Sequence, residues 1–159
     1  MTLIIGTPLG VWGDRKITSN SGEVCDPLKK VVANDVLVAG FAGDFFVILK
    51  AIQEVESGTE DPKLLAKVAD TSGKEPIYIE GIVVKQGRIY ILDSGKSWVR
   101  PKGTAYYGMG TGGTTAMAFL SGIAKVRRKV TDDDISAAFH YVSKCRDDCS
   151  STHDYLEAP

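Results

Sequence analysis

The first residues of the chain could support nucleophilic catalysis. Thr2 follows Met1, and a small second residue such as threonine allows methionine aminopeptidase to remove the initiator methionine. A free N-terminal threonine carries a hydroxyl nucleophile and its own base, because an α-amino group titrates at roughly pH 7.7–8.0. The same residue could simply begin a strand, so its position marks Thr2 as a candidate nucleophile and does not identify it by itself.

A glycine loop in the second half of the chain suggests ligand binding or a tight turn. Residues 108–113 read Gly-Met-Gly-Thr-Gly-Gly, between an expected strand and an expected helix. A dinucleotide-binding fold would need a further strand that ends in an acidic residue about 20 positions on. Asp133 lies there but begins a helix, which argues against a nicotinamide or flavin cofactor. The loop is either a tight turn or a nest of N–H groups beside an active site.

The cysteines and histidines do not form a known metal or triad motif. Cys145, Cys149 and His153 recur every four residues and would align on a continued helix. Zinc sites use four ligands at other spacings, so we interpret this alignment as coincidental. His140 falls in an amphipathic segment, and neither histidine flanks a Ser or Cys motif, so a histidine-based triad has little support. We expect neither a metal nor another cofactor.

Composition limits the kinds of protein that this chain can be. The 159 residues, 43% apolar and 25% charged, suffice for a single domain spanning 1–159 with a substantial core. A formal net charge of −1 offers no basic field for nucleic acid or an anionic membrane. The sequence has no apolar run of about 20 residues and no signal-peptide pattern at its start. Three cysteines favour free thiols in a reducing compartment, so we expect a soluble cytoplasmic protein.

The hydrophobic pattern alternates between blocks of strands and blocks of helices. Short apolar runs predict strands in residues 2–39, including a hairpin of 31–33 with 36–39, and again between 77 and 107. Thr131 and Asp134 have the spacing of a capping box at a helix start. Two strand-then-helix blocks favour an α+β fold with two antiparallel sheets faced by helices. Apolar residues at helical spacing predict four helices, at 44–57, 62–68, 114–128 and 131–146.

Short motifs follow one another in a definite order along nearly the whole chain. Thr2-Leu3-Ile4-Ile5 is followed by Gly13-Asp14, and Lys30 comes 16 positions after Asp14. Further on, 39–44 contains A-G-x-x-G, 110–113 reads G-T-G-G and 146–150 reads R-D-x-x-S. In this order and spacing they resemble the motifs of the proteasome β-subunit and bacterial HslV family of N-terminal nucleophile threonine peptidases.

The resemblance implies a role for each matching residue. Thr2 would be the nucleophile and, through its amine, the general base. Lys30 would polarise the Thr2 hydroxyl, Asp14 would orient Lys30, and the backbone N–H of Gly40 would form the oxyanion hole. The Thr2 amine and its water would be supported by three further residues: Thr111, where the family has serine, Asp147 and Ser150.

The resemblance also implies a fold, a substrate pocket and partners. The fold would be a four-layer αββα sandwich, in stacked rings of identical subunits that act on peptides or unfolded proteins, with an ATP-dependent unfoldase as a candidate partner. A pocket without charged side chains would favour apolar residues before the scissile bond. It would be lined by Ile17, Leu28, Val32, Val38, Ala42 and Phe46.

Two other functions stay open. If Met1 is retained, Thr2 has an amide in place of an amine, and the chain would be a non-catalytic proteasome-like scaffold subunit. An N-terminal nucleophile amidohydrolase that acts on small amides would share the nucleophile but would need a closed pocket. The segment after Ser150 reads as a short polar tail, so we expect the last strand of the family's second sheet to be missing.

Overall fold

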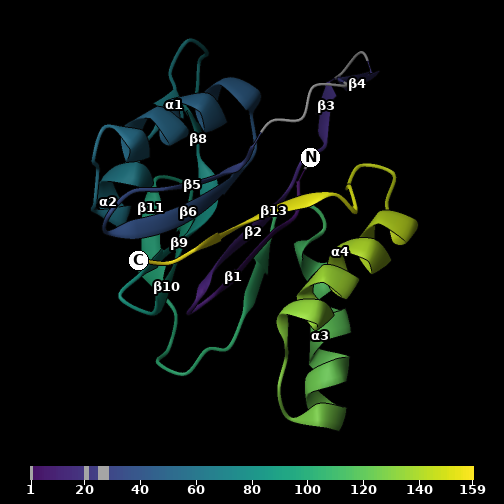
Figure 1. Cartoon of the computed structure of the whole chain (residues 1–159). Helices are drawn as coiled ribbons and strands as arrows, with labels where there is room; N and C mark the ends of the chain where they lie inside the picture. Colours follow the sequence, from purple (N-terminus) through teal and green to yellow (C-terminus); the bar gives the residue numbers. More distant parts are fainter. Residues whose placement is uncertain (1, 20–21, 25–28) are drawn as a thin grey trace.

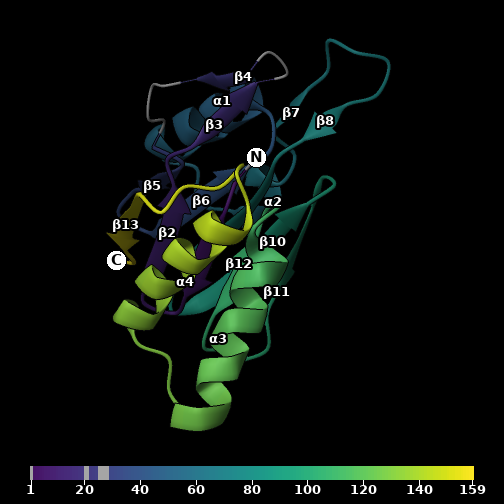
Figure 2. The same ribbon diagram turned by 90° about the vertical axis from the view of Figure 1, so that its right-hand side faces the viewer.

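The computed structural model of the chain describes residues 2–19, 22–24 and 29–159. The protein folds into four layers. Figure 1 shows α1 (Phe45–Glu56) and α2 (Pro62–Leu65) on one side, α3 (Gly113–Arg127) and α4 (Asp132–Cys145) on the other, and two large sheets between them. In Figure 2, α3 and α4 lie side by side in front of the strands. This is the αββα sandwich that the order of the blocks predicts.

The first sheet is built around the N-terminal hairpin, in which β1 (Ile4–Thr7) and β2 (Gly10–Asp14) pair antiparallel. β12 (Tyr107–Met109) lies on the other side of β1, and β13 (His153–Glu157) on the other side of β2. The order is therefore β12-β1-β2-β13, with every pair antiparallel. The hairpin places the residues that precede β1 beside the end of β2.

Strand β13 corrects the expectation of a polar tail. Its side chains point alternately toward α3 and α4 and toward the second sheet. Polar and apolar residues occur in both sets, so the sequence of the strand shows no clear hydrophobic pattern. Tyr155 stacks on Trp12 with ring centroids 4.2 Å apart. Leu156 packs against the core between the two sheets. The sheet therefore keeps a final strand, made from residues that look solvent-exposed in the sequence.

The second large sheet has the order β11-β10-β9-β6-β5, again with antiparallel pairs. The predicted hairpin of 31–33 with 36–39 is confirmed as β5 and β6. Its strands are β5 (Val31–Ala33), β6 (Leu37–Ala42), β9 (Glu80–Lys85), β10 (Arg88–Asp93) and β11 (Lys96–Val99). Two short ribbons complete the described strands: β3 (Ile17–Ser19) with β4 (Gly22–Val24), and β7 (Ala69–Asp70) with β8 (Ile77–Tyr78).

Three buried apolar clusters fill the three spaces between the four layers. Strand alternation sends Leu3 and Ile5 toward α3 and α4, and Ile4 toward the second sheet. The outer cluster under α1 and α2 includes Phe41, Val47 and Leu65. Each face of each large sheet is thus covered, and the N-terminal strand lies in the middle of the molecule.

The helix ends agree with the sequence pattern at three of four helices. Asp44 caps α1, with its carboxylate accepting from the Phe46 N–H at 2.9 Å. Thr131 caps α4 and forms the predicted capping box with Asp134. α2 is shorter than predicted, because the chain leaves the helix after Leu65 and enters β7. None of the described helices has the length and apolar character needed to cross a membrane.

Candidate active site

Three side chains from the N-terminal half meet in the interior of the molecule. The Lys30 Nζ donates to Thr2 Oγ1 at 2.9 Å and to Asp14 Oδ1 at 2.8 Å. It also donates to the backbone carbonyl of Lys16. All three residues are buried: Lys30 is 2% exposed, Thr2 3% and Asp14 0%. An ammonium group has three protons to donate, so it can form a hydrogen bond with each of these acceptors.

The backbone positions these side chains through pairs of hydrogen bonds. The Asp14 N–H donates to Leu3 O at 3.0 Å, and the Leu3 N–H donates back to Asp14 Oδ1 at 3.2 Å. The carboxylate at the end of β2 is thus held next to the residue that follows Thr2. Lys30 is fixed to the second sheet because its carbonyl accepts from the Phe41 N–H at 2.9 Å. The site therefore bridges the two large sheets.

Burial dominates the electrostatics of Asp14. Removal from water raises the pKa of this carboxyl, while the Lys30 ammonium and the N–H groups of Ser150 and Leu3 oppose the rise. The Ser150 N–H donates to Asp14 Oδ2 at 3.1 Å. Both carboxylate oxygens consequently have donors, which is what a buried acid needs to serve as the counter-charge of a lysine.

The glycine loop encloses the backbone of Thr2. The Thr2 N–H donates to Thr111 Oγ1 at 3.3 Å, and the Gly112 N–H donates to Thr2 O at 3.4 Å. Gly110 has a φ of 82°, and a Cβ there would lie 2.2 Å from Thr2 O, so only glycine allows this approach. The loop is a tight turn beside the candidate site, and α4 follows α3 where a dinucleotide fold would need a strand.

Ser150 contacts the site through its backbone N–H, whereas Asp147 contacts the neighbouring Lys16 side chain through its carbonyl. The Asp147 carbonyl accepts from the Lys16 side chain, and the Ser150 hydroxyl accepts from the Thr152 N–H at 3.0 Å. Among the hydrogen bonds of the described residues, neither side chain is joined to Thr2. The support of the Thr2 amine by these two side chains stays a prediction, and the contact observed here is the Ser150 N–H on Asp14.

Gly40 lies inside β6, where the register pairs it with Ile82 of β9. The next residue, Phe41, donates its N–H to Lys30 O. Because successive N–H groups of a strand point to opposite edges, the Gly40 N–H points toward β9 and away from the edge that holds Lys30. The structure therefore does not bring this N–H to Thr2, contrary to the oxyanion role that the resemblance implies.

The four expected pocket residues whose side chains the structure describes do not lie together. Val38 and Ala42 are buried in the core between the two sheets, whereas Val32 belongs to the cluster beneath α1 and α2 on the opposite face. Phe46 is 66% exposed at the start of α1. The prediction of one pocket ignores the alternation of side chains across β5 and β6. Two other expected members lie outside what the structure describes, namely the side chain of Ile17 and residue Leu28.

The structure adds two residues that the sequence analysis missed as parts of the site. Lys16 supplies a backbone carbonyl to Lys30, which no side-chain pattern can reveal. The Cys149 sulfur packs against the glycine loop, since a Cβ placed on Gly112 would lie 3.0 Å from it. The suspected alignment of Cys145, Cys149 and His153 is broken, because α4 ends at Cys145. No group of three or more His, Cys, Asp or Glu side chains in the described part of the chain could hold a metal ion.

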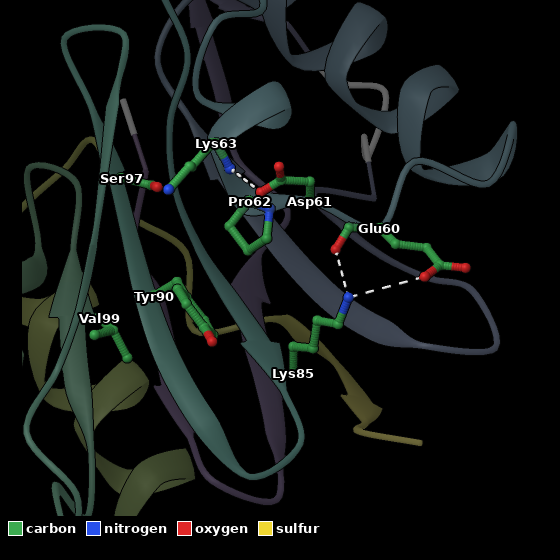
Figure 3. A pocket seen from close by; sticks show the side chains of 8 residues that line it. All are labelled: Glu60, Asp61, Pro62, Lys63, Lys85, Tyr90, Ser97 and Val99. Atoms are coloured by element: carbon green, nitrogen blue, oxygen red, sulfur yellow. Dashed lines mark hydrogen bonds and ion pairs between the residues drawn. The ribbon is translucent and has the colours of Figure 1, made fainter.

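A separate hollow of about 540 Å³ lies between α2 and strands β10 and β11. Lys85 donates to the Glu60 carbonyl at 2.9 Å and pairs with the Glu60 carboxylate at 3.9 Å. Figure 3 marks both contacts with dashed lines. Of the expected catalytic and pocket residues that the structure describes, none lines this hollow. Its lining is Glu60, Asp61, Pro62, Lys63, Lys85, Tyr90, Ser97 and Val99.

The fold is shared with known proteins at low sequence identity. No protein-family model and no curated protein matches this sequence. The solved structure of eukaryotic HslV from Trypanosoma brucei superimposes with a TM-score of 0.75 and 19% identity, covering 98% of this chain and 97% of that one. Thiobacillus denitrificans BPH, also solved in complex with epoxomicin, gives a TM-score of 0.73 and 9% identity over 98% of this chain and 96% of that one. The chain thus has an HslV-like fold, as the order of the motifs predicts.

Proposed function

We propose that the chain is a threonine endopeptidase that hydrolyses peptide bonds with Thr2 after Met1 is removed. The observation that carries this proposal is the buried chain of contacts from Asp14 through Lys30 to Thr2 Oγ1, with distances of 2.8 and 2.9 Å. The HslV-like fold supports it, and the sequence motifs assign these three residues the roles of nucleophile, lysine and acid.

The hydrogen bond from Lys30 to Thr2 suggests which group takes the proton of the Thr2 hydroxyl. Thr2 Oγ1 accepts a hydrogen bond from Lys30, so its own proton is free to point toward a base. Once Met1 is removed, the nearest base in the chain is the α-amine of Thr2 itself, with a pKa of roughly 7.7–8.0 in the absence of perturbation. Lys30 also favours the anionic form of the oxygen by placing a positive charge beside it.

The proposed reaction is acyl transfer in two steps. Thr2 Oγ1 attacks the peptide carbonyl carbon, and its proton passes to the α-amine, directly or through one water. The C–N bond then breaks as the protonated amine gives its proton to the leaving nitrogen, which leaves an ester on Thr2. Water, deprotonated by the same amine, attacks this ester and releases the acid with Thr2 restored. We assign no part to the Gly40 N–H, since it points into the sheet.

The setting of the reaction belongs to the same proposal. Stacked rings of identical subunits would enclose the active sites, with peptides or unfolded proteins as substrates in the cytoplasm. An unfoldase that feeds such a ring is a further candidate partner. The HslV-like fold supports the assembly, and seclusion would prevent an exposed nucleophile from cutting other proteins.

A peptidase assay on trimmed and untrimmed protein tests the function. Protein shown by intact mass to lack Met1 should cleave fluorogenic peptides. The matched control carries an N-terminal extension that cannot be removed, and it should be inactive because its Thr2 nitrogen is an amide. Cleavage by the extended protein would overturn the proposed mechanism. Assembled, trimmed protein that cleaves neither peptides nor small amides would favour the scaffold alternative, and cleavage of small amides alone would favour an amidohydrolase.

A further inference from the structure

Arg15 and Asp154 form an ion pair next to the site, and the reaction above gives neither residue a part. The Arg15 guanidinium donates from Nε to Asp154 Oδ2 at 2.9 Å and from Nη2 to Asp154 Oδ1. Asp154 lies on β13 opposite Gly13 of β2, and Arg15 comes two residues after Gly13. The pair therefore runs diagonally between the two strands, and its two parallel hydrogen bonds fix the orientation of both groups.

Arg15 stands between two residues that hold the Lys30 ammonium. Asp14 precedes it and accepts from Lys30 through Oδ1 at 2.8 Å. Lys16 follows it and accepts from Lys30 through its backbone carbonyl. Because β2 ends at Asp14, the direction of the Lys16 carbonyl is set by the contacts that hold the short segment after the strand.

Strand β13 and the chain that leads into it supply these contacts. The Arg15 N–H donates to Thr152 O at 3.2 Å, and the Lys16 ammonium donates to the carbonyl of Asp147. Together with the ion pair to Asp154, these bonds attach both the backbone and the side chain of Arg15 to the same part of the chain.

We propose that Arg15 and Asp154 are a positioning pair for the Lys30 ammonium. The pair holds the segment that carries the Lys16 carbonyl, and this carbonyl helps to keep Lys30 Nζ at 2.9 Å from Thr2 Oγ1. Without the pair the carbonyl can turn away, and the ammonium is then held less firmly beside the nucleophile. The inference rests on the proposed function, since it gives the pair a part in the activation of Thr2.

The exposure of the pair separates positioning from stabilisation of the fold. The side chains of Arg15 and Asp154 are 36% and 12% exposed. An ion pair that is open to water contributes little to the free energy of unfolding. Its loss should therefore leave the denaturation midpoint close to that of the parent and act mainly on the geometry around Lys30.

Kinetics of the trimmed enzyme, expressed per competent site, test the inference. An electrophile directed at N-terminal threonine counts these sites by the amount of protein that it labels at completion. Arg15→Gln and Asp154→Ala should each lower kcat per labelled site by about tenfold, with KM changed by less than about twofold. A structural role alone would lower the number of sites and leave the rate per site unchanged, and that result would overturn the inference.

A double variant and a matched control show whether the two residues act as a pair. Arg15→Gln combined with Asp154→Ala should lose no more than either single variant, because each already lacks the pair. Losses that multiply would contradict the proposal. The control is Arg127→Gln, which removes an ion pair of the same kind with Asp134 at 3.2 Å, at the far end of α3. It should behave like the parent, and an equal loss in the control would also contradict the proposal.

Amide hydrogen exchange separates this inference from the proposed function. In protein that keeps Met1, Asp154→Ala should speed exchange of the Arg15 N–H by about tenfold, because the bond to Thr152 O opens more often. Arg127→Gln should leave this exchange unchanged. Faster exchange in a trimmed enzyme that cleaves nothing would mean that the pair holds the segment and that the proposed reaction is wrong. Exchange that does not respond to Asp154→Ala would overturn the positioning pair, whatever the activity.

Discussion

At the scale of single residues, the site depends on a buried ammonium that donates to Thr2, Asp14 and a backbone carbonyl. Lys30 is 2% exposed, and an unpaired charge at that depth would be strongly unfavourable. Asp14 supplies the opposite charge, while Thr2 and the Lys16 carbonyl complete the hydrogen bonds. The Thr2 hydroxyl accepts one of the hydrogen bonds of the lysine, so the same contact that helps to satisfy the charge also polarises the hydroxyl.

Removal of this ammonium should make stability depend on pH through Asp14. Burial already raises the pKa of Asp14, and Lys30 is the largest opposing influence. In Lys30→Ala we expect a loss of about 3–5 kcal/mol in the free energy of unfolding near neutral pH, because a buried carboxylate is left unpaired. The folded-state pKa then rises further above the unfolded value of about 3.9. The penalty is full above the folded-state pKa and disappears as the pH falls toward the unfolded value, where Asp14 is neutral in both states.

Urea unfolding at about pH 5 and about pH 8 measures this dependence. Lys30→Ala should lie closer to the parent at the lower pH. The double variant Lys30→Ala with Asp14→Asn is the control, since it lacks the titrating group and should differ from the parent by a nearly constant amount. A single variant with the same loss at both pH values would contradict this account of Asp14.

At the scale of elements, the two large sheets approach each other where glycines replace side chains. A Cβ on Gly40 would lie 2.7 Å from Val11 Cγ1 and 2.8 Å from Ile4 Cγ2, both on the first sheet. The glycine of the A-G-x-x-G motif is thus needed for packing in this chain, whatever else it does. The close approach of the two sheets also determines the distance between Thr2 and Lys30, because Thr2 precedes β1 of the first sheet and Lys30 precedes β5 of the second.

Gly40→Ala should therefore destabilise the protein without any change in charge. We expect a loss of about 1–3 kcal/mol, the usual cost of forcing a methyl group into a filled core. Gly122→Ala is the matched control, since Gly122 lies within α3 and a Cβ there meets nothing within 4 Å. That change should stabilise the helix by about 0.5–1 kcal/mol. Denaturation curves of the two variants should move in opposite directions, and equal stability of Gly40→Ala and the parent would show that the sheets can separate at low cost.

Strand β13 supplies a second prediction at this scale. Tyr155 stacks on Trp12 and donates its hydroxyl proton to Leu9 O at 3.3 Å. Tyr155→Ala should lower the free energy of unfolding by about 1–3 kcal/mol, because it removes both the aromatic pair and buried ring area. Tyr155→Phe keeps the stack and should cost less than about 1 kcal/mol. Thermal unfolding compares them, and equal losses in the two variants would mean that the hydroxyl matters more than the stack.

The elements also show what the sequence could and could not reveal. The helices and the β5–β6 hairpin were predictable, because their apolar residues recur at the period of each structure. Strand β13 was not predictable, since both faces of the strand carry polar residues as well as apolar ones. The Lys16 carbonyl and the direction of the Gly40 N–H depend on backbone register, which side-chain types do not encode. Val32 and Val38 could have been assigned to opposite faces had the hairpin register been applied to the pocket.

At the scale of the whole molecule, the fold leaves several large apolar side chains exposed on the described surface. Val126 is 82% exposed on α3, and Phe46 is 66% exposed at the start of α1. Trp98 on β11 is 48% exposed. Side chains of this kind are suited to burial between subunits, and a closed ring would give each copy the same contacts.

We therefore expect a ring-forming homo-oligomer in solution. Size-exclusion chromatography with light scattering should give a mass that is a multiple of the 17.1 kDa chain, stable at micromolar concentration. Val126→Lys and Phe46→Lys test which face forms the contact, since a charge at a buried interface should shift the distribution toward smaller species. A stable monomer under the same conditions would contradict the ring and would leave the nucleophile without the seclusion that we propose.

The central claim, that Thr2 acts as an N-terminal nucleophile, is tested most directly by intact-mass spectrometry after incubation with an electrophile directed at N-terminal threonine. The account predicts a protein that has lost one methionine and gained one adduct, located on Thr2 by fragmentation. Thr2→Ala should gain none, and Lys30→Ala should react at least about 10²-fold more slowly. An adduct on trimmed Thr2→Ala protein, or no adduct on trimmed and assembled parent protein, would contradict the account.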